Sequence, residues 1–121
     1  VMTITAKPKP RQRLARGMGN RAEALLSKQL IDLGYEVRRT HLSAFPDLIA
    51  WNHNDLLFIE VKARSKPQDI TKALSVFRTD ARLLKVAHKD AILLCYVRQN
   101  AQWNAFAWFN GETIQVRPLI E

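Results

Sequence analysis

The sequence predicts one α+β domain, a mixed β-sheet with helices packed against it. The chain has 121 residues, of which 47% are apolar and 25% charged, as in an ordinary single globular domain. Two segments repeat apolar residues at the helical period, and six shorter segments are rich in β-formers and bounded by turn residues. Their order along the chain is α-β-β-β-α-β-β-β, which is typical of a mixed sheet covered by helices.

The first half of the chain is expected to hold a basic arm, one helix and three strands. Residues 1–18 read as a flexible basic arm, because prolines and a glycine interrupt its cations, and residues 19–121 as the domain. Asn20–Leu33 repeats apolar residues at the helical period, and Gly34 is a natural stop. Strands are expected at residues 35–40, 47–51 and 56–63, with a polar turn at 52–55.

The second half is expected to contain one helix followed by three strands. Asp69–Ala87 has apolar residues on one side and cations on the other, which is by default a solvated face but in a basic chain can also follow a DNA backbone. Strands are expected at residues 91–97, 103–109 and 113–117. The cations of the helix and its end are Lys72, Arg78, Arg82, Lys85 and Lys89.

The charge favours a polyanionic partner. Lys and Arg outnumber Asp and Glu by 19 to 11, which gives a net charge of +8. Nucleic acid is the first expected partner and an anionic membrane surface the second, with charge for solubility as the alternative. From Lys7 to Arg21 there are cations and no acid, and the interleaved prolines disfavour a membrane-bound helix. An arm lying along phosphates is the favoured interpretation, and a solvated tail is the other.

Two further features bear on the compartment. No apolar run is long enough to cross a bilayer, and the amino-terminal segment does not resemble a signal peptide. The single cysteine, Cys95, lies in an apolar stretch, which favours a buried, reduced thiol over a reactive one. We therefore expect an intracellular protein, in the cytoplasm and associated with the nucleoid.

The residues that point to chemistry are Asp47, Glu60 and Lys62. Glu60 and Lys62 lie two apart near the end of an otherwise apolar strand, so they share one face while Ile59 and Val61 take the other. Charges on so apolar a strand are costly unless each is paired or binds something. The hairpin through residues 52–55 brings Asp47 alongside. Two carboxylates and one ammonium are thus expected to meet at one edge of the sheet.

This grouping suits a hard divalent cation. Mg²⁺ prefers oxygen ligands and keeps several waters, so Asp47, Glu60 and the backbone carbonyl of Val61 are sufficient protein ligands, and Mn²⁺ is a substitute. A cation held there acidifies water and stabilises charge on a phosphate. Lys62 is expected to orient the nucleophile, to help deprotonate it or to stabilise the phosphate in the transition state.

Pro46-Asp47 followed by Glu60-Val61-Lys62 resembles the PD-(D/E)XK nuclease superfamily. The helix-first αβββαβ order is similar to its restriction-endonuclease-like core. Within the superfamily the sequence looks most like the archaeal-type Holliday junction resolvases, which begin with a basic segment and a helix that carries Gly, Arg and Glu; here residues 19–23 read Gly-Asn-Arg-Ala-Glu. The resemblance implies that Glu23 is a further acidic active-site residue and a possible metal ligand. An ordinary surface carboxylate paired with Arg16 or Lys28 is the alternative.

The resemblance also implies an activity and a substrate. It predicts a magnesium-dependent, structure-selective endonuclease that cuts branched DNA, and a homodimer, because symmetric cutting of a four-way junction needs two sites. Such resolvases often carry a polar residue before the Pro-Asp pair, for which Ser43 is the candidate. Many superfamily members place a Gln early in the second helix, whereas Gln68 precedes the expected helix here. The expected DNA-binding residues are Lys9, Arg11, Arg13, Arg16, Arg21, Ser43, Arg64 and Lys66.

Two other functions stay open on the sequence. One is a phage, mobile-element or restriction-type DNA nuclease of the same fold, and the other is a DNA-binding module without activity. Zinc is not expected, because there are no paired cysteines and the histidines have no metal-ligand spacing. Trp51, Trp103 and Trp108 are expected to pack against the sheet and not to stack on bases.

Overall fold

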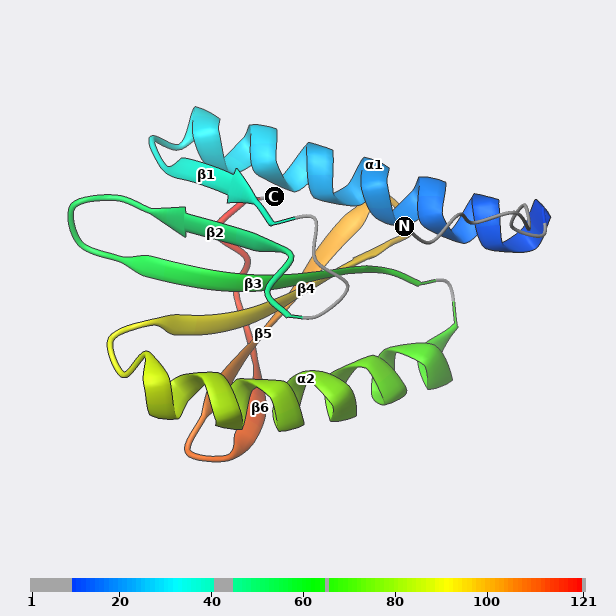
Figure 1. Ribbon diagram of the computed structural model, residues 1–121. Coiled ribbons are helices and arrows are strands. Elements are labelled where there is room, and N and C mark those ends of the chain that lie inside the picture. Colours follow the sequence, from blue (N-terminus) through cyan, green and yellow to red (C-terminus); the bar gives the residue numbers. More distant parts are fainter. Residues whose placement is uncertain (1–9, 41–44, 65, 121) are drawn as a thin grey trace, which may run out of the picture.

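The structure, a computed structural model, describes residues 10–40, 45–64 and 66–120, and for residues 10–18 it describes the backbone alone. The order of helices and strands is α-β-β-β-α-β-β-β, as the sequence predicts (Figure 1). The elements are α1 (Pro10–Asp32), β1 (Glu36–Arg39), β2 (Leu48–Trp51), β3 (Leu56–Ala63), α2 (Pro67–Ala87), β4 (Ile92–Gln99), β5 (Gln102–Phe109) and β6 (Glu112–Val116).

The strands form one mixed sheet in the order β1-β2-β3-β4-β5-β6. Only β3 and β4 are parallel among these neighbours, and all other neighbouring strands are antiparallel. Antiparallel neighbours need only short turns, whereas parallel neighbours need a long crossover, which α2 supplies. The predicted mixed sheet with helices against it is therefore confirmed.

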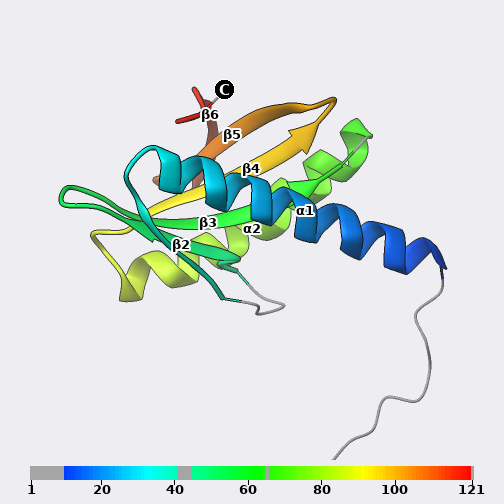
Figure 2. The ribbon, with the colours of Figure 1, turned by 90° about the horizontal axis from the view of Figure 1, so that it is seen from above.

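The two helices cover opposite faces of the sheet (Figures 1 and 2). Helix α1 buries Ala22, Leu26 and Leu30 against one face, and α2 buries Ala73, Phe77 and Ala81 against the other. Strand β3 lies between them and is buried on both faces, as its apolar sequence predicts. Its odd-numbered residues Leu57, Ile59 and Val61 join the α1 cluster, and its even-numbered Phe58 joins the α2 cluster.

The amino-terminal boundary differs from the prediction. Helix α1 begins at Pro10, ten residues earlier than expected, so residues 10–18 are helical and not a flexible arm. Arg, Gln, Leu, Ala and Met of this segment are good helix formers, and proline is well tolerated at the first helical position. Figure 2 shows these first turns extending past the sheet. Residues 1–9 of the predicted arm lie outside the described residues.

Four smaller observations complete the fold. Helix α2 begins at Pro67, so Gln68 stands in its first turn and not before it. Cys95 is fully buried, as predicted, and burial raises the pKa of its thiol to about 12. Trp103 packs on Tyr96 in the core, also as predicted. Neither described helix combines the length and apolar character needed to span a membrane.

Candidate active site

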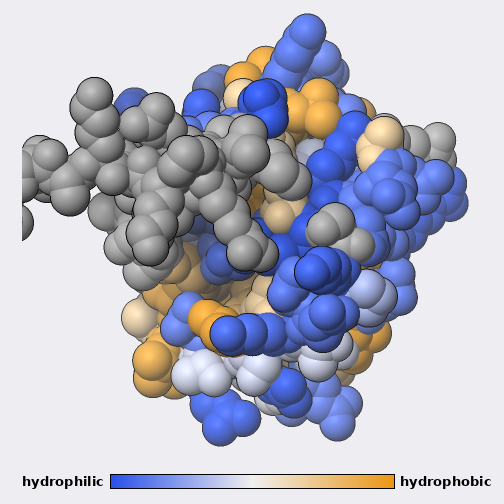
Figure 3. Space-filling view, turned by 90° about the vertical axis from the view of Figure 1, so that its right-hand side faces the viewer, coloured by the Kyte–Doolittle hydropathy of each residue, from blue (hydrophilic) through white to orange (hydrophobic). Residues whose placement is uncertain are grey.

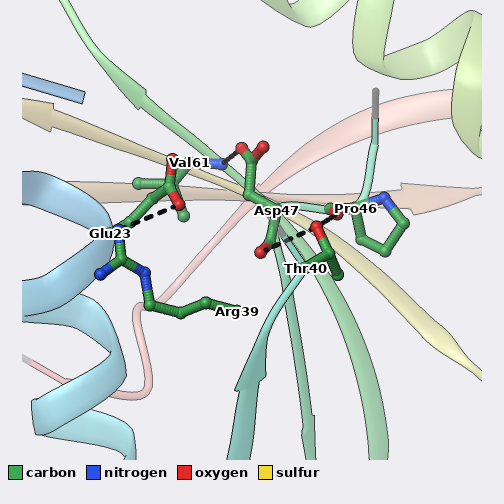
Figure 4. Close-up of polar contacts among 6 residues, drawn as sticks. All are labelled: Glu23, Arg39, Thr40, Pro46, Asp47 and Val61. Carbon is green, nitrogen blue, oxygen red and sulfur yellow. Dashed lines mark hydrogen bonds and ion pairs between the residues drawn. The ribbon is translucent and has the colours of Figure 1, made fainter. Parts of the chain in front are cut away.

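The site lies where β3 continues beyond its neighbour β2. The register between these strands pairs Leu48 with Ile59, and the rest of β3 pairs only with β4. Asp47 fixes this junction twice. Its backbone N–H donates to the Ile59 carbonyl at 2.9 Å, and its Oδ2 accepts the Val61 N–H at 2.8 Å (Figure 4). The Asp47 carboxylate is thereby held against the open edge of β3, where the hairpin was predicted to bring it.

Asp47 also stands where the regular strand pairing ends at this edge. The regular pairing of β2 with β3 ends at Leu48 opposite Ile59, and Asp47 donates its N–H to that same Ile59 carbonyl. The β3 residues beyond Ile59 therefore have no regular β2 partner on this side. Because the N–H and C=O of one strand residue point to the same side, the Val61 carbonyl faces the Asp47 side of β3. The expected backbone ligand is thus on the correct edge.

Glu60 and Lys62 project from the face of β3 that α2 covers, opposite to the face of Ile59 and Val61. Lys62 Nζ lies 3.3 Å from Glu60 Oε2, and Glu60 is only 5% exposed. Burial raises the pKa of Glu60 to about 8, helped by hydrogen bonding to Asp47 and by the Asp47 charge, while Lys62 lowers it. The structure therefore brings the predicted two carboxylates and one ammonium together.

This arrangement fits a divalent cation. Two adjacent carboxyl groups, one of them buried, cannot both ionise cheaply unless a proton or a cation balances their charge. Asp47, Glu60 and the Val61 carbonyl offer the oxygen donors that Mg²⁺ prefers. Among the residues that the structure describes, no three His, Cys, Asp or Glu side chains form a metal-binding group. Glu23 is therefore not gathered with the other two acids into such a group.

Glu23 nevertheless lies near this region. Its carboxylate on α1 pairs with Arg39 of β1 at 3.5 Å, and its side chain is only 18% exposed (Figure 4). The structure thus shows an ion pair between Glu23 and a strand arginine, and the side chain of Arg16, one of the predicted partners, lies outside the described part of the chain. Thr40, next to Arg39, donates its hydroxyl to the Pro46 carbonyl at 2.7 Å. This bond ties the end of β1 to the segment that carries Asp47.

The predicted DNA-binding residues fall into three groups. Arg21, Arg64 and Lys66 are described, and Arg21 and Arg64 line one hollow at the carboxyl end of β3. The positions of Arg11, Arg13 and Arg16 lie on α1, where only the backbone is described. Lys9 and Ser43 lie outside the described residues.

Sequence reasoning missed two cations near the site, Arg39 and Arg98, and named Lys72 only as one of the cations of the second helix. Arg39 pairs with Glu23, Lys72 of α2 shares a hollow with Lys62, and Arg98 of β4 shares a hollow with Arg64. Arg98 stands beside Ala63 in the parallel register. That register depends on how the crossover helix packs, so the sequence offers no local signal for it. The sequence around Arg39, at the end of a short strand, likewise gives no indication that this arginine lies near the site.

Comparison with known proteins supports the fold. No protein-family model matches the chain, and no curated protein sequence matches it. Among solved structures, it is similar to Hjc, a Holliday junction resolvase from the archaeal hyperthermophile Archaeoglobus fulgidus, with a TM-score of 0.54 and 24% sequence identity. The match covers 74% of this chain and 71% of that chain. The similarity establishes a resolvase-like fold, and the roles of individual residues rest on the geometry described above.

Proposed function

We propose that this protein is a magnesium-dependent endonuclease that hydrolyses phosphodiester bonds in DNA and selects branched substrates such as four-way junctions. The observation that carries the proposal is the carboxylate pair, Asp47 and Glu60, placed beside Lys62 at the open end of a buried strand. The fold shared with a Holliday junction resolvase and the net charge of +8 support it.

Each residue has a chemical task in this reaction. Asp47, Glu60 and the Val61 carbonyl hold the cation, and the Val61 N–H keeps the Asp47 carboxylate in place. When bound, the cation lowers the pKa of water and balances negative charge on the phosphate. The Lys62 ammonium, 3.3 Å from Glu60, orients the attacking water and stabilises the charge that develops on the phosphate oxygens. Glu23, held by Arg39, adds an acid on the α1 side.

The substrate follows from charge and size. A polyanion binds a chain of charge +8 mainly through its phosphates, and such contacts carry little sequence information. We propose a homodimer, because two cuts placed symmetrically in a four-way junction need two active sites and each chain supplies one.

The test is cleavage of labelled four-way junction, nicked duplex, linear duplex and single-stranded DNA in Mg²⁺. Asp47→Asn is the informative variant, because the amide oxygen can still accept the Val61 N–H while the ligand charge is lost. Asp90→Ala is the matched control, since it removes an exposed aspartate from the turn before β4. We expect paired cuts in the junction by the wild type and by the control, and none by Asp47→Asn.

The rival functions give different results in the same experiment. Cleavage of plain duplex at a rate similar to that of the junction would point to a restriction-type or mobile-element nuclease of the same fold. Tight binding without cleavage in Mg²⁺ or Mn²⁺ would overturn the enzyme and leave a DNA-binding module. Size-exclusion chromatography with light scattering tests the homodimer, and a monomer that cuts junctions in pairs would refute that part.

A further inference from the structure

A hollow of about 300 Å³ lies between α1 and the carboxyl ends of β3 and β4. Three arginines from three different elements line it, namely Arg21 of α1, Arg64 after β3 and Arg98 of β4. Among the described residues no acidic side chain lines it, and Gln99 and Asn100 belong to its lining. We call it the arginine hollow. Three positive charges without a lining counter-charge form a site for an anion.

Two of the three arginines of this hollow are held in place by the fold. The Arg98 guanidinium lies 5.1 Å from the centre of the Trp103 ring, and the indole N–H donates to Gln29 of α1 at 2.9 Å. Arg64 donates from Nη1 to the Ala63 carbonyl at 2.8 Å. A guanidinium has five N–H donors, so each arginine keeps donors for a ligand after these contacts. Such restraint lowers the entropy cost of binding.

The arginine hollow adjoins the candidate active site. Arg64 also lines a second hollow of about 280 Å³, together with Lys62 and Lys72, on the α2 side of the same strand end. We call this one the lysine hollow, and Asp69 is the one acid among the described residues that line it. Figure 3 looks onto this end of the molecule, where hydrophilic residues gather around the centre of the face. A basic path thus runs from Lys62 over Arg64 to Arg98.

We propose that the arginine hollow binds a backbone phosphate of the same DNA strand whose scissile phosphate lies at Lys62. This inference rests on the proposed function for the position of the scissile phosphate. Arginine is suited to the task, because its planar fork can donate two parallel hydrogen bonds to the oxygens of one phosphate. The strand crosses the end of β3 at Arg64, from the α2 side to the α1 side. Arg98 is the residue to test, since it lines the arginine hollow but not the lysine hollow, whereas Arg64 lines both.

The test is binding of a fluorescent four-way junction in EDTA, where no strand is cut, across a series of salt concentrations. Each phosphate contact adds about 0.9 to the slope of log K against log salt. For Arg98→Ala we expect the slope to fall by about 1 and the affinity to fall about tenfold at moderate salt. Arg98→Lys keeps the charge but not the fork, so it should retain most of the slope and lose part of the affinity.

Arg38→Ala is the matched control, because it also removes one arginine, from an exposed position of β1 that lines neither hollow. Its slope and affinity should stay near those of the wild type. Equal losses for Arg98→Ala and Arg38→Ala, or no loss for either, would overturn the proposal. Arg98→Lys tests it independently should Arg98→Ala fail to fold: its affinity, measured on folded protein, must fall, and wild-type affinity would overturn the proposal.

The outcome is separable from that of the proposed function. Normal junction cleavage with unaltered binding by Arg98→Ala would leave the nuclease standing and remove the phosphate site. Suppose instead that the wild type cuts no DNA but the salt slope of Arg98→Ala is lower than that of the wild type. That result would support the phosphate site and refute the nuclease.

Discussion

Replacing Glu60 with Gln should make the metal-free protein more stable, and the gain should grow with pH. Gln is the closest neutral copy of a protonated Glu, and its amide can donate to Asp47 in the same way. Folding raises the pKa of Glu60 from 4.5 to about 8, chiefly because burial removes the carboxylate from water. The folded state therefore holds this proton more tightly than the unfolded state.

The sign and size follow from linkage. An acid whose pKa rises on folding contributes stability that is complete below pH 4.5 and is lost as the pH rises to and past 8. Each pH unit between the two values costs about 1.4 kcal/mol. From pH 5 to pH 8 the wild type should therefore lose about 3 kcal/mol that the Gln variant keeps. That is a large part of the roughly 5–15 kcal/mol that holds a domain folded.

The assay is urea unfolding of both proteins in EDTA at pH 5, 6, 7 and 8. We expect the two proteins to have similar free energies of unfolding at pH 5 and to diverge by about 3 kcal/mol at pH 8. Mg²⁺ should then stabilise the wild type more at pH 8 than at pH 6, because the cation replaces the proton, and should stabilise the variant little. Glu112→Gln on exposed β6 is the control, with a change within about 0.5 kcal/mol at every pH. A difference between Glu60→Gln and the wild type that is flat from pH 5 to pH 8 would refute the reasoning.

Three more predictions concern the site and the core. Lys62→Met should lower the single-turnover cleavage rate by about a hundredfold to a thousandfold while junction binding in EDTA falls much less; equal losses in both would make Lys62 a binding residue only. Arg39→Gln should slow cleavage about tenfold, and the double variant with Glu23→Gln should be no slower than Glu23→Gln alone; additive losses would show that Arg39 acts independently of the 3.5 Å ion pair. Phe77→Ala should cost about 3–5 kcal/mol in urea unfolding, because the ring is fully buried, whereas Leu83→Ala, at 70% exposure, should stay within about 0.5 kcal/mol; similar values would place the core elsewhere.

The sequence predicts the sheet well because its strands are marked by apolar runs and turns. The boundaries of β3 agree with the prediction at both ends, since Asn52–Asp55 precedes the strand and polar residues follow it. The predicted start of α1 is wrong because the composition of residues 10–18 suits both a basic arm and a helix. The charge and the prolines of this segment suggested an arm, whereas its good helix formers favour the helix that the structure has. Neither is a signal strong enough to fix a helix boundary.

For the site too, the features that depend on local sequence were predicted, and those that depend on contacts between distant elements were not. Strand alternation predicts that Glu60 and Lys62 share a face, and hairpin distance predicts that Asp47 joins them; both are confirmed. The partners of these residues from distant elements were not predicted. Arg39 reaches Glu23 only because β1 pairs with β2, and Arg98 reaches Arg64 only because β4 lies parallel to β3. Such contacts depend on the strand order, which periodicity alone does not give.

The cost of Glu60 is itself an argument for a function at this end of the sheet. The α2 side of the sheet is otherwise filled by Phe58, Phe77, Cys95 and Val97, and an apolar residue at position 60 would extend that cluster. Replacing a buried ionic group with a well-packed apolar one is often neutral or stabilising, so stability alone does not explain a buried Glu beside Asp47. The cation of the proposed function would explain it, because a cation compensates the charge that burial penalises. Local rules of a fold are broken where a ligand offsets the cost, and here the break lies beside two hollows lined by arginine and lysine.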